Sequence, residues 1–402
     1  MRFTSPVKTV LVLAALVVII AGLRVAGGFF LPMFSALFLA VISAPLVRFF
    51  ERRARLPEAL AILLTLLIDV GLVVGFGALL YESFTGFAEA LPRYQVALNA
   101  LADSVVSTLR AWNVPVERDL LDELRSAGAL MGVVGDLVHE ITQFVSNAVM
   151  VLLLLGFLLF ESRGAREKLH VLLGRGNPHI ERTAIAAYEV QRYLVVKTVL
   201  SVLTGVLTGC WMAVCGLDFP LLWALLAFLL NYIPSLGPAL SLAPPVVVAL
   251  LTLGPGGTAA VAAGHLSIGF VIGNVLEPRM MGQTLGLSTL VVFASMFFFF
   301  WLWGPVGALF AAPLTMLVRS ALEVSEETRW IAVLLGSGEY VERKRREWGW
   351  TTLDERAAGA PPPEPPSESE PPPAPPEAKP LEETVEQLRE VRAERPAGDA
   401  AQ

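Results

Sequence analysis

Two apolar runs, each too short to cross a membrane, meet at a proline- and glycine-rich break within residues 219–251. The break, residues 231–238, reads Asn-Tyr-Ile-Pro-Ser-Leu-Gly-Pro. A membrane-crossing helix needs about 20 apolar residues, and proline interrupts helical hydrogen bonding. Because lipid cannot satisfy free backbone groups, irregular backbone at membrane depth must face protein or a water-filled cavity. The stretch therefore predicts either two half-helices beside a polar cavity or a tight surface loop between two short spans.

The rest of the chain is also built from apolar blocks of membrane-span length. Of its 402 residues, 55% are hydrophobic and 16% are charged, whereas about a quarter of the residues in a soluble domain are charged. We therefore expect an all-α, polytopic integral membrane protein with about eight membrane segments, which include broken or re-entrant helix pairs. The net charge of −6 says little about partners, and no basic cluster suggests nucleic acid.

The apolar pattern divides the chain into five parts. These are a three-span N-terminal bundle (1–81), an extracytoplasmic insert of amphipathic helices (82–143), a membrane core with broken helices at 219–251 and 285–318 (144–320), a juxtamembrane cytoplasmic segment (321–357) and a disordered tail rich in Pro and Glu (358–402). Residues 113–115 should split the insert into two helices.

We expect ordinary spans at 7–23, 29–47, 59–80, 141–160, 199–217 and 258–276. The amphipathic residues 180–196 should lie flat at the inner interface. Pro278 should stop the last of these spans, where Glu277 and Arg279 mark an interface. The long run 285–318 should break at 303–305 and again at Pro313, and Arg319 should end it.

Charge bias orients these spans. Arginines cluster within 48–55 and again within the basic stretch 163–197, which places both segments in the cytoplasm by the positive-inside rule. The insert is acid-rich and should lie outside. Whether neither, one or both of the broken pairs are re-entrant, the number of crossings stays even, so both termini should be cytoplasmic.

Motifs for catalysis and cofactor binding do not occur in the sequence. It has no G-x-x-x-x-G-K-[ST] phosphate-binding loop, no Cys/His set with metal-ligand spacing and no G-x-S-x-G nucleophile motif. We therefore expect no enzyme, no cofactor and no metal site. An intramembrane hydrolase would need paired Asp, Ser or His residues on facing spans, and the pattern indicates none.

Ionisable residues at membrane depth are few, and the cost of burying them makes each one a candidate for function. Asp69 lies in the middle of the third span and Glu277 near a span end, so both are candidates for proton or ion coupling. His265 is a third ionisable residue at this depth. The alternative to a functional role is that its imidazole is neutral and hydrogen-bonds a neighbouring helix. Asn231 and Asn274 suit hydrogen bonds to a small solute or an ion, or bonds between helices.

We expect the two breaks to face each other and to bind a small solute or an ion between half-helix ends. The predicted substrate-binding residues come from both breaks and from the end of the preceding span: Asn231, Pro234, Ser235, Gly237, Pro238, Asn274, Glu277, Pro278, Gly304 and Pro305.

Several segments resemble the motifs of a known family. Residues 231–238 look like its N-x-I-P-x-x-G-P break, and residues 274–282 resemble its N-x-x-x-P-[KR]-x-x-G element. Three further segments, 285–288, 304–307 and 312–314, together resemble the closing hairpin of that family. Together these segments resemble the autoinducer-2 exporter family of bacterial membrane transporters. Gln191 stands where that family often has a Gly-Gln pair, with Val190 in place of the glycine.

The resemblance covers residues 1–319 and leaves out the Pro-rich tail. It implies a secondary transporter of the bacterial inner membrane that exports a small solute, such as the signalling molecule autoinducer-2, and that forms a homo-oligomer. Some members are linked to sodium or lithium/proton antiport, so an antiporter with Asp69 or Glu277 as the proton carrier is one alternative. A membrane scaffold protein without transport activity is another.

Overall fold

The computed structural model describes residues 5–111, 147–161, 178–234, 236–281, 286–325 and 327–348, together with Gly164 and Lys168. The chain forms two units, Met1–Ser337 and Gly338–Gln402. In the described residues the only β pairing is one antiparallel bridge between Leu287 and Gly336, and all regular structure is helical. The prediction of an all-α protein is confirmed.

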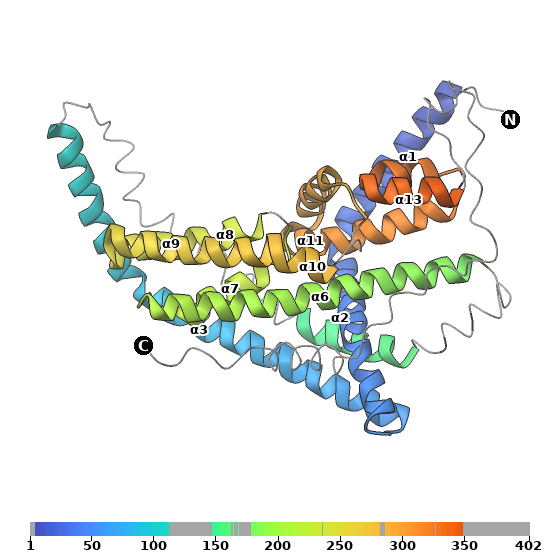
Figure 1. Ribbon diagram of the computed structural model, residues 1–402, viewed down its shortest axis with the longest axis horizontal. Helices are drawn as coiled ribbons and strands as arrows, with labels where there is room; N and C mark the ends of the chain where they lie inside the picture. Colours follow the sequence, from blue (N-terminus) through green and yellow to red (C-terminus); the bar gives the residue numbers. More distant parts are fainter. Residues whose placement is uncertain are drawn as a thin grey trace, which may run out of the picture. The chain divides into compact units, whose positions relative to one another are not determined.

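Helices follow one another along the first unit, as Figure 1 shows. They are α1 (Ser5–Val25), α2 (Gly27–Arg52), α3 (Glu58–Ala111), an unlabelled helix (Asn147–Glu161), α6 (Pro178–Val214), α7 (Pro220–Leu230), α8 (Gly237–Thr252), α9 (Gly254–Val271), the π-helix η1 (Ile272–Leu276), α10 (Glu277–Met281), α11 (Thr289–Val324) and α12 (Arg329–Leu335). The second unit contributes α13 (Gly338–Trp348).

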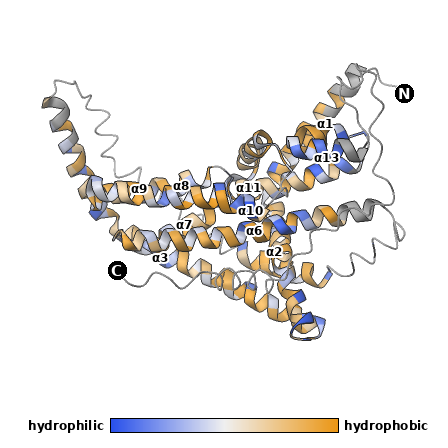
Figure 2. Cartoon of the chain, viewed as in Figure 1, coloured by the Kyte–Doolittle hydropathy of each residue, from blue (hydrophilic) through white to orange (hydrophobic). Residues whose placement is uncertain are grey.

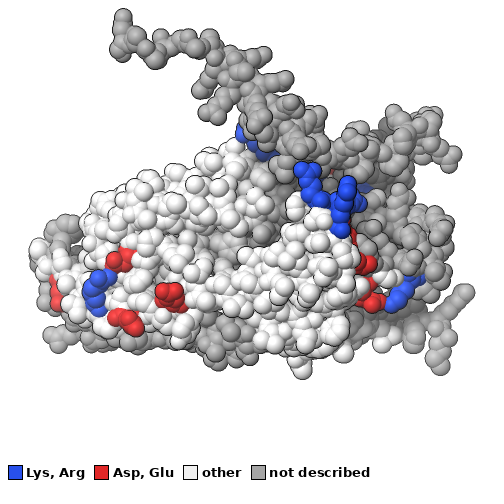
Figure 3. Space-filling model, turned by 90° about the horizontal axis from the view of Figure 1, so that it is seen from below, with Lys and Arg blue, Asp and Glu red and all other residues white. Residues whose placement is uncertain are grey.

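The described helices carry the apolar surface of a membrane protein. Five of them are long and apolar enough to cross a bilayer, and Figure 2 shows apolar residues along most of their length. Large apolar side chains such as Val18, Phe270 and Phe297 are more than half exposed, and the face in Figure 3 has a broad area without charged side chains. Such a surface is unfavourable in water and suits contact with lipid.

The helix α3 continues well beyond the predicted third span. We expected a span at 59–80 and separate amphipathic helices from residue 82, but one helix runs through 54 residues to Ala111. The prediction relied on falling hydrophobicity, which does not end a helix, and Pro92 is accommodated within it. Phe84 and Tyr94 on this extension lie in one apolar cluster with Trp223. The expected split at 113–115 lies outside the described residues.

The helix α6 is likewise continuous where the sequence predicted two segments. The stretch expected to lie flat, 180–196, and the span expected at 199–217 up to Val214 lie in one helix of 37 residues. Val190, Tyr193 and Leu194 are buried, so the amphipathic pattern reflects contact with protein on one face. The predicted interfacial segment is wrong for this reason.

The first predicted break is confirmed. The helices α7 and α8 are 11 and 16 residues long, or about 16 and 24 Å, and each is shorter than the about 30 Å hydrocarbon core. Non-helical residues, 231–234 and 236, lie between them. Gly205 and Gly209 of α6 let α7 approach closely, since an added Cβ at either position would lie within 3 Å of Ala224 atoms.

Of the two interruptions predicted in the run 285–318, the first is present and the second is not. The helix α11 is interrupted at Trp303 and Gly304, and Gly304 has φ +70°, a conformation that glycine adopts readily. Pro313 does not interrupt the helix, and Arg319 lies inside it and is buried. Pro313 is tolerated because neighbouring helices can satisfy the backbone group that proline frees. The predictions for Pro313 and Arg319 are therefore wrong.

The helix also continues past Pro278, which was expected to stop it. A π-helical turn, η1, precedes Glu277, and helical structure then runs to Met281. A proline ring in an α-helix clashes with the carbonyl four residues earlier. The wider π turn gives that carbonyl room, so the helix is deformed and not ended.

Both breaks use the same packing device. A Cβ added at Gly237 would lie 2.1 Å from the carbonyl oxygen of Leu230, and one added at Gly307 would lie 2.1 Å from that of Phe299. In each case the chain after the break passes directly over a carbonyl of the helix before it. Only glycine permits this approach.

We predict that Gly237→Ala and Gly307→Ala each destabilise the protein by about 1–3 kcal/mol, because the added methyl group would force backbone apart. Thermal unfolding in detergent would measure the loss. Gly75→Ala on α3 is the matched control, since nothing lies within 4 Å of its Cβ position. Equal melting temperatures for the three variants would show that the breaks are loosely packed.

Candidate functional site

The two breaks lie against each other. Ile233 of the first break shares one buried apolar cluster with Met296, Ala308 and Ala311, which flank the second break. Leu230, Leu236 and Phe299 pack around the same cluster. Because residues 296 and 308 lie in one cluster, the two halves of α11 fold back on each other at Trp303. The direct contact between the breaks is therefore apolar.

Side-chain hydrogen bonds hold the first break against α6. Asn231 is buried and donates through Nδ2 to the Ser201 hydroxyl at 3.0 Å. Next to it, the Tyr232 hydroxyl donates to Thr198 Oγ1 at 2.8 Å. Asn231 thus makes the interhelical bond that was the alternative to solute binding. Both bonds are polar links that a hydroxylated solute would be able to replace.

The other predicted residues of the first break have structural contacts. Gly237 packs on the Leu230 carbonyl. The Pro238 carbonyl accepts a hydrogen bond from Ser241 Oγ at 3.1 Å, and a Cβ on Gly269 of α9 would lie 3.4 Å from the proline ring. Pro234 lies in the turn, and Ser235 lies outside the described residues.

The second break is anchored to the junction of α1 and α2. The Trp303 indole Nε1 donates to the Leu23 carbonyl oxygen at 2.9 Å, one of the last four carbonyls of α1, which lack partners within a helix. The same ring leaves no room for a side chain at Gly27. Gly304 and Pro305 follow directly, so their position is fixed by this tryptophan.

Glu277 meets a partner that the sequence did not indicate. Lys197 Nζ of α6 lies 2.8 and 3.0 Å from its two carboxylate oxygens, and the lysine side chain is only 5% exposed. The ion pair lies at the end of η1, and such π turns are frequent at functional sites. We had counted Lys197 among the cytoplasmic basic residues and paired Glu277 with Arg279. The missed signal was the spacing of Lys197 from Ser201, Thr204 and Thr208 on one face of α6.

Asn274 and Pro278 are not brought into this group. Asn274 is exposed, and its Nδ2 donates to the Phe270 carbonyl of its own helix at 3.2 Å. Pro278 is exposed as well. Of the second predicted motif, Glu277 pairs with Lys197 of α6, and Met281 shares a buried apolar cluster with Val190, Tyr193 and Leu194 of the same helix.

Asp69 is buried at a separate place between α2 and α3. Ser43 Oγ donates to its Oδ1 at 2.9 Å. The other oxygen, Oδ2, has no hydrogen-bond partner among the residues that the structure describes. A buried carboxylate with one satisfied oxygen would need a proton or a cation. Asp69 stays a candidate for coupling.

A second buried ion pair and a glutamine tie α6 to other helices. Arg319 of α11 donates to Glu189 Oε2 at 3.1 Å. Gln191 donates to the Val41 carbonyl of α2 at 2.9 Å and accepts a hydrogen bond from Arg48 at 3.2 Å. Sequence analysis gave Arg319 no role except as a boundary.

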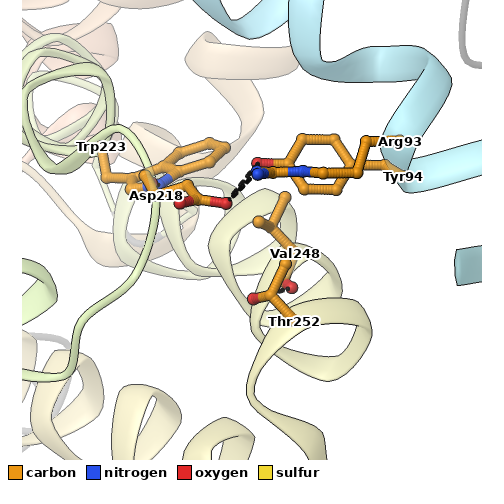
Figure 4. A network of polar contacts seen from close by, with 6 residues as sticks. All are labelled: Arg93, Tyr94, Asp218, Trp223, Val248 and Thr252. Atoms are coloured by element: carbon orange, nitrogen blue, oxygen red, sulfur yellow. Dashed lines mark hydrogen bonds and ion pairs between the residues drawn. The ribbon is translucent and has the colours of Figure 1, made fainter.

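A polar network at the start of α7 holds the α3 extension (Figure 4). The Tyr94 hydroxyl donates to Asp218 Oδ2 at 2.9 Å, and Arg93 pairs with the same oxygen. The Trp223 indole donates to the Asp218 backbone oxygen at 2.7 Å. Phe219, the next residue, adopts a left-handed conformation with φ +57°. Asp218 therefore anchors the turn between α6 and α7.

One facing pair of the type that a hydrolase would need is present. His265 Nε2 of α9 lies 3.0 Å from Ser241 Oγ of α8. Ser241 Oγ also lies 3.1 Å from the Pro238 carbonyl oxygen, and the direction of the serine–imidazole hydrogen bond depends on the tautomer of the ring.

We predict that Glu277→Gln lowers stability by about 3–5 kcal/mol, because it leaves the Lys197 ammonium buried without its counter-charge. The double variant Lys197→Met/Glu277→Gln should recover most of the loss. Thermal unfolding measures both. The exposed pair Lys168–Glu161 is the control, and Glu161→Gln should change little. A double variant no more stable than Glu277→Gln would contradict the assignment.

Comparison with known proteins agrees with this architecture. The family described as AI-2E family transporter matches residues 13–327. A putative transport protein of Haemophilus influenzae is 36% identical over 342 residues, which cover 83% of this chain and 97% of that protein. The AI-2 transport protein TqsA of Escherichia coli is 36% identical over 328 residues, 82% of this chain and 95% of TqsA.

A more distant relative, a putative transport protein of Borreliella burgdorferi, is 29% identical over 326 residues, 80% of this chain and 88% of that protein. The matches cover the helices that form both breaks and the helices that hold them. This chain therefore belongs to the AI-2E transporter family and is a multi-pass membrane transport protein.

Proposed function

We propose that this protein exports a small hydroxylated solute, of the kind called AI-2 in the name of its Escherichia coli relative. The observation that carries the proposal is the way the first break is held. Hydroxyl and amide groups of α6 and the break hydrogen-bond each other at Ser201–Asn231 and Thr198–Tyr232. A solute that offers equivalent groups replaces these bonds at little cost.

Exchange of these bonds would supply the conformational step of a carrier. A ligand shifts a conformational equilibrium only by its differential affinity for the two states. With the solute absent, the break is tied to α6, and with the solute bound, the same groups face the solute. Since the sequence has no phosphate-binding loop, an ion or proton gradient is the energy source in this proposal.

The same proposal places the protein in a bacterial inner membrane. The basic segments at 48–55 and 163–197 support cytoplasmic termini, and in this proposal the part of α3 beyond residue 81 belongs to the extracytoplasmic insert. Glycine-rich spans support a homo-oligomer, because small residues allow close helix contact.

A second candidate is cation/proton antiport, which the Lys197–Glu277 pair favours. In this mechanism Na⁺ or Li⁺ competes with the Lys197 ammonium for the Glu277 carboxylate, and Asp69 or Glu277 carries the proton.

Efflux from liposomes tests the first candidate. Purified protein should release autoinducer-2 down an imposed proton or sodium gradient. Asn231→Ala and Ser201→Ala should each slow release by about tenfold, because each leaves a buried polar partner unsatisfied. Val202→Ala is the control on the same helix, since Val202 is half exposed on an apolar face. Sodium-dependent proton flux without autoinducer-2 release would favour the antiporter, and no flux at all would favour the scaffold.

Asp69 is tested in the same liposomes. Asp69→Asn keeps the shape and the bond from Ser43 but cannot ionise, so it should remove the pH dependence of transport while thermal stability stays close to that of the unchanged protein. Release rates from pH 5.5 to 8.5 measure this. A pH profile identical to that of the unchanged protein would assign Asp69 a structural role.

A further inference from the structure

Three buried polar residues come from three packed helices, since α6 and α8 both contact α9. They are Thr208 of α6, Ser241 of α8 and His265 of α9, and each is at most 3% exposed. Trp211 sets the register of α6 and α9, because its indole donates to the Ala260 carbonyl at 3.1 Å and its ring packs on Gly264. Thr208 is one turn from Trp211, and His265 follows Gly264. We call these three residues the polar layer.

Hydrogen bonds link two residues of the polar layer. Ser241 Oγ lies 3.1 Å from the Pro238 carbonyl oxygen and 3.0 Å from His265 Nε2. Whether the serine or the imidazole donates in this pair depends on the tautomer of the ring. His265 Nδ1 has no hydrogen-bond partner among the described residues. One ring nitrogen of the layer is therefore left unpaired in a buried place.

Thr208 of α6 carries a second buried atom without a hydrogen-bond partner among the described residues. On α6, Thr198 and Thr204 donate to the carbonyls of Leu194 and Leu200, four residues earlier. Thr208 makes no such bond, and its hydroxyl has no partner among the described residues. Buried polar groups are hydrogen-bonded in nearly all native proteins, and an unpaired one indicates a water, an ion or a ligand.

A row of polar side chains connects the layer with the first break. Lys197, Ser201, Thr204 and Thr208 are spaced at four, three and four residues, which places them on one face of α6 over about 16 Å. Val199, Val202 and Val206 on the same helix are about half exposed and face away. The row thus runs inside the protein, from the ion pair with Glu277 to the polar layer.

We infer that the polar layer is a second binding station for the transported solute, which it takes by a hydroxyl group. That group would hydrogen-bond both His265 Nδ1 and Thr208 Oγ1, the two buried atoms that lack partners among the described residues. The inference rests on the proposed function, because it assumes that the solute carries hydroxyl groups. It extends the path along α6 beyond the breaks, and it adds Thr208 and His265 to the residues that select the solute.

Thiol labelling tests access to the layer without any substrate. Cys210→Ala and Cys215→Ala remove the two native thiols, and Thr208→Cys or Ser241→Cys is then added. In liposomes, a charged, water-soluble thiosulfonate should modify either new thiol at least ten times faster than it modifies Val206→Cys, which faces lipid. Autoinducer-2 should slow the modification. Rates equal to that of Val206→Cys would overturn the inference, and so would a lack of protection by autoinducer-2 in a protein that exports it.

Transport by hydroxyl variants supplies the second measurement. Thr208→Val removes the hydroxyl at constant shape and should raise the KM for autoinducer-2 at least fivefold, while Thr208→Ser should restore it. An unchanged KM in Thr208→Val would contradict the inference even if autoinducer-2 is exported. If the unchanged protein moves no autoinducer-2, the proposed function fails, and the labelling ratio alone still decides whether the layer is open to water.

Discussion

The arrangement of this protein depends on how it satisfies backbone that cannot stay helical inside a membrane. Each break frees carbonyl and amide groups that lipid cannot pair, and the chain covers them with protein. At the first break, Gly237 passes over the Leu230 carbonyl, and α6 binds the turn through Ser201 and Thr198. At the second, Trp303 satisfies a terminal carbonyl of α1. The helix α6 is central to this arrangement.

Buried charge adds a second constraint on the same helix. Lys197 pairs with Glu277 and Glu189 pairs with Arg319, so α6 holds both later membrane elements through ions of opposite sign. A buried pair adds little net stability, because desolvation offsets most of the attraction. A helix that slips by one residue leaves two buried charges unpaired, and the pairs therefore define the register of α6 against its neighbours.

The sequence was sufficient to predict the membrane class and the position of both breaks, because proline and glycine act on the backbone where they stand. It was misleading wherever a distant residue compensated for a local signal. Arg319 and Glu277 looked like span ends, yet their partners Glu189 and Lys197 lie 130 and 80 residues away. The fall in hydrophobicity after residue 80 also led to a predicted end of α3 that is too early. The aromatic contacts of α3 with the α7 turn, which support its extension, cannot be recognised from the local sequence. For the same reason the sequence predicted Asn231 and Glu277 at the candidate site but not their partners on α6.

The π turn before Glu277 has a consequence for the length of the chain. A turn of this kind holds one residue more than an α-helical turn. Because the extra residue is absorbed within one revolution, deleting one residue of Ile272–Leu276 would restore the α-helical pitch and keep Glu277 on about the same face of the helix. Deleting a residue from the regular part of α9 would instead rotate everything that follows by about 100° about the helix axis, and Glu277 would point away from Lys197 although both residues remained. The π turn is therefore the one part of the helix before Glu277 whose length can change by one residue without loss of the ion pair.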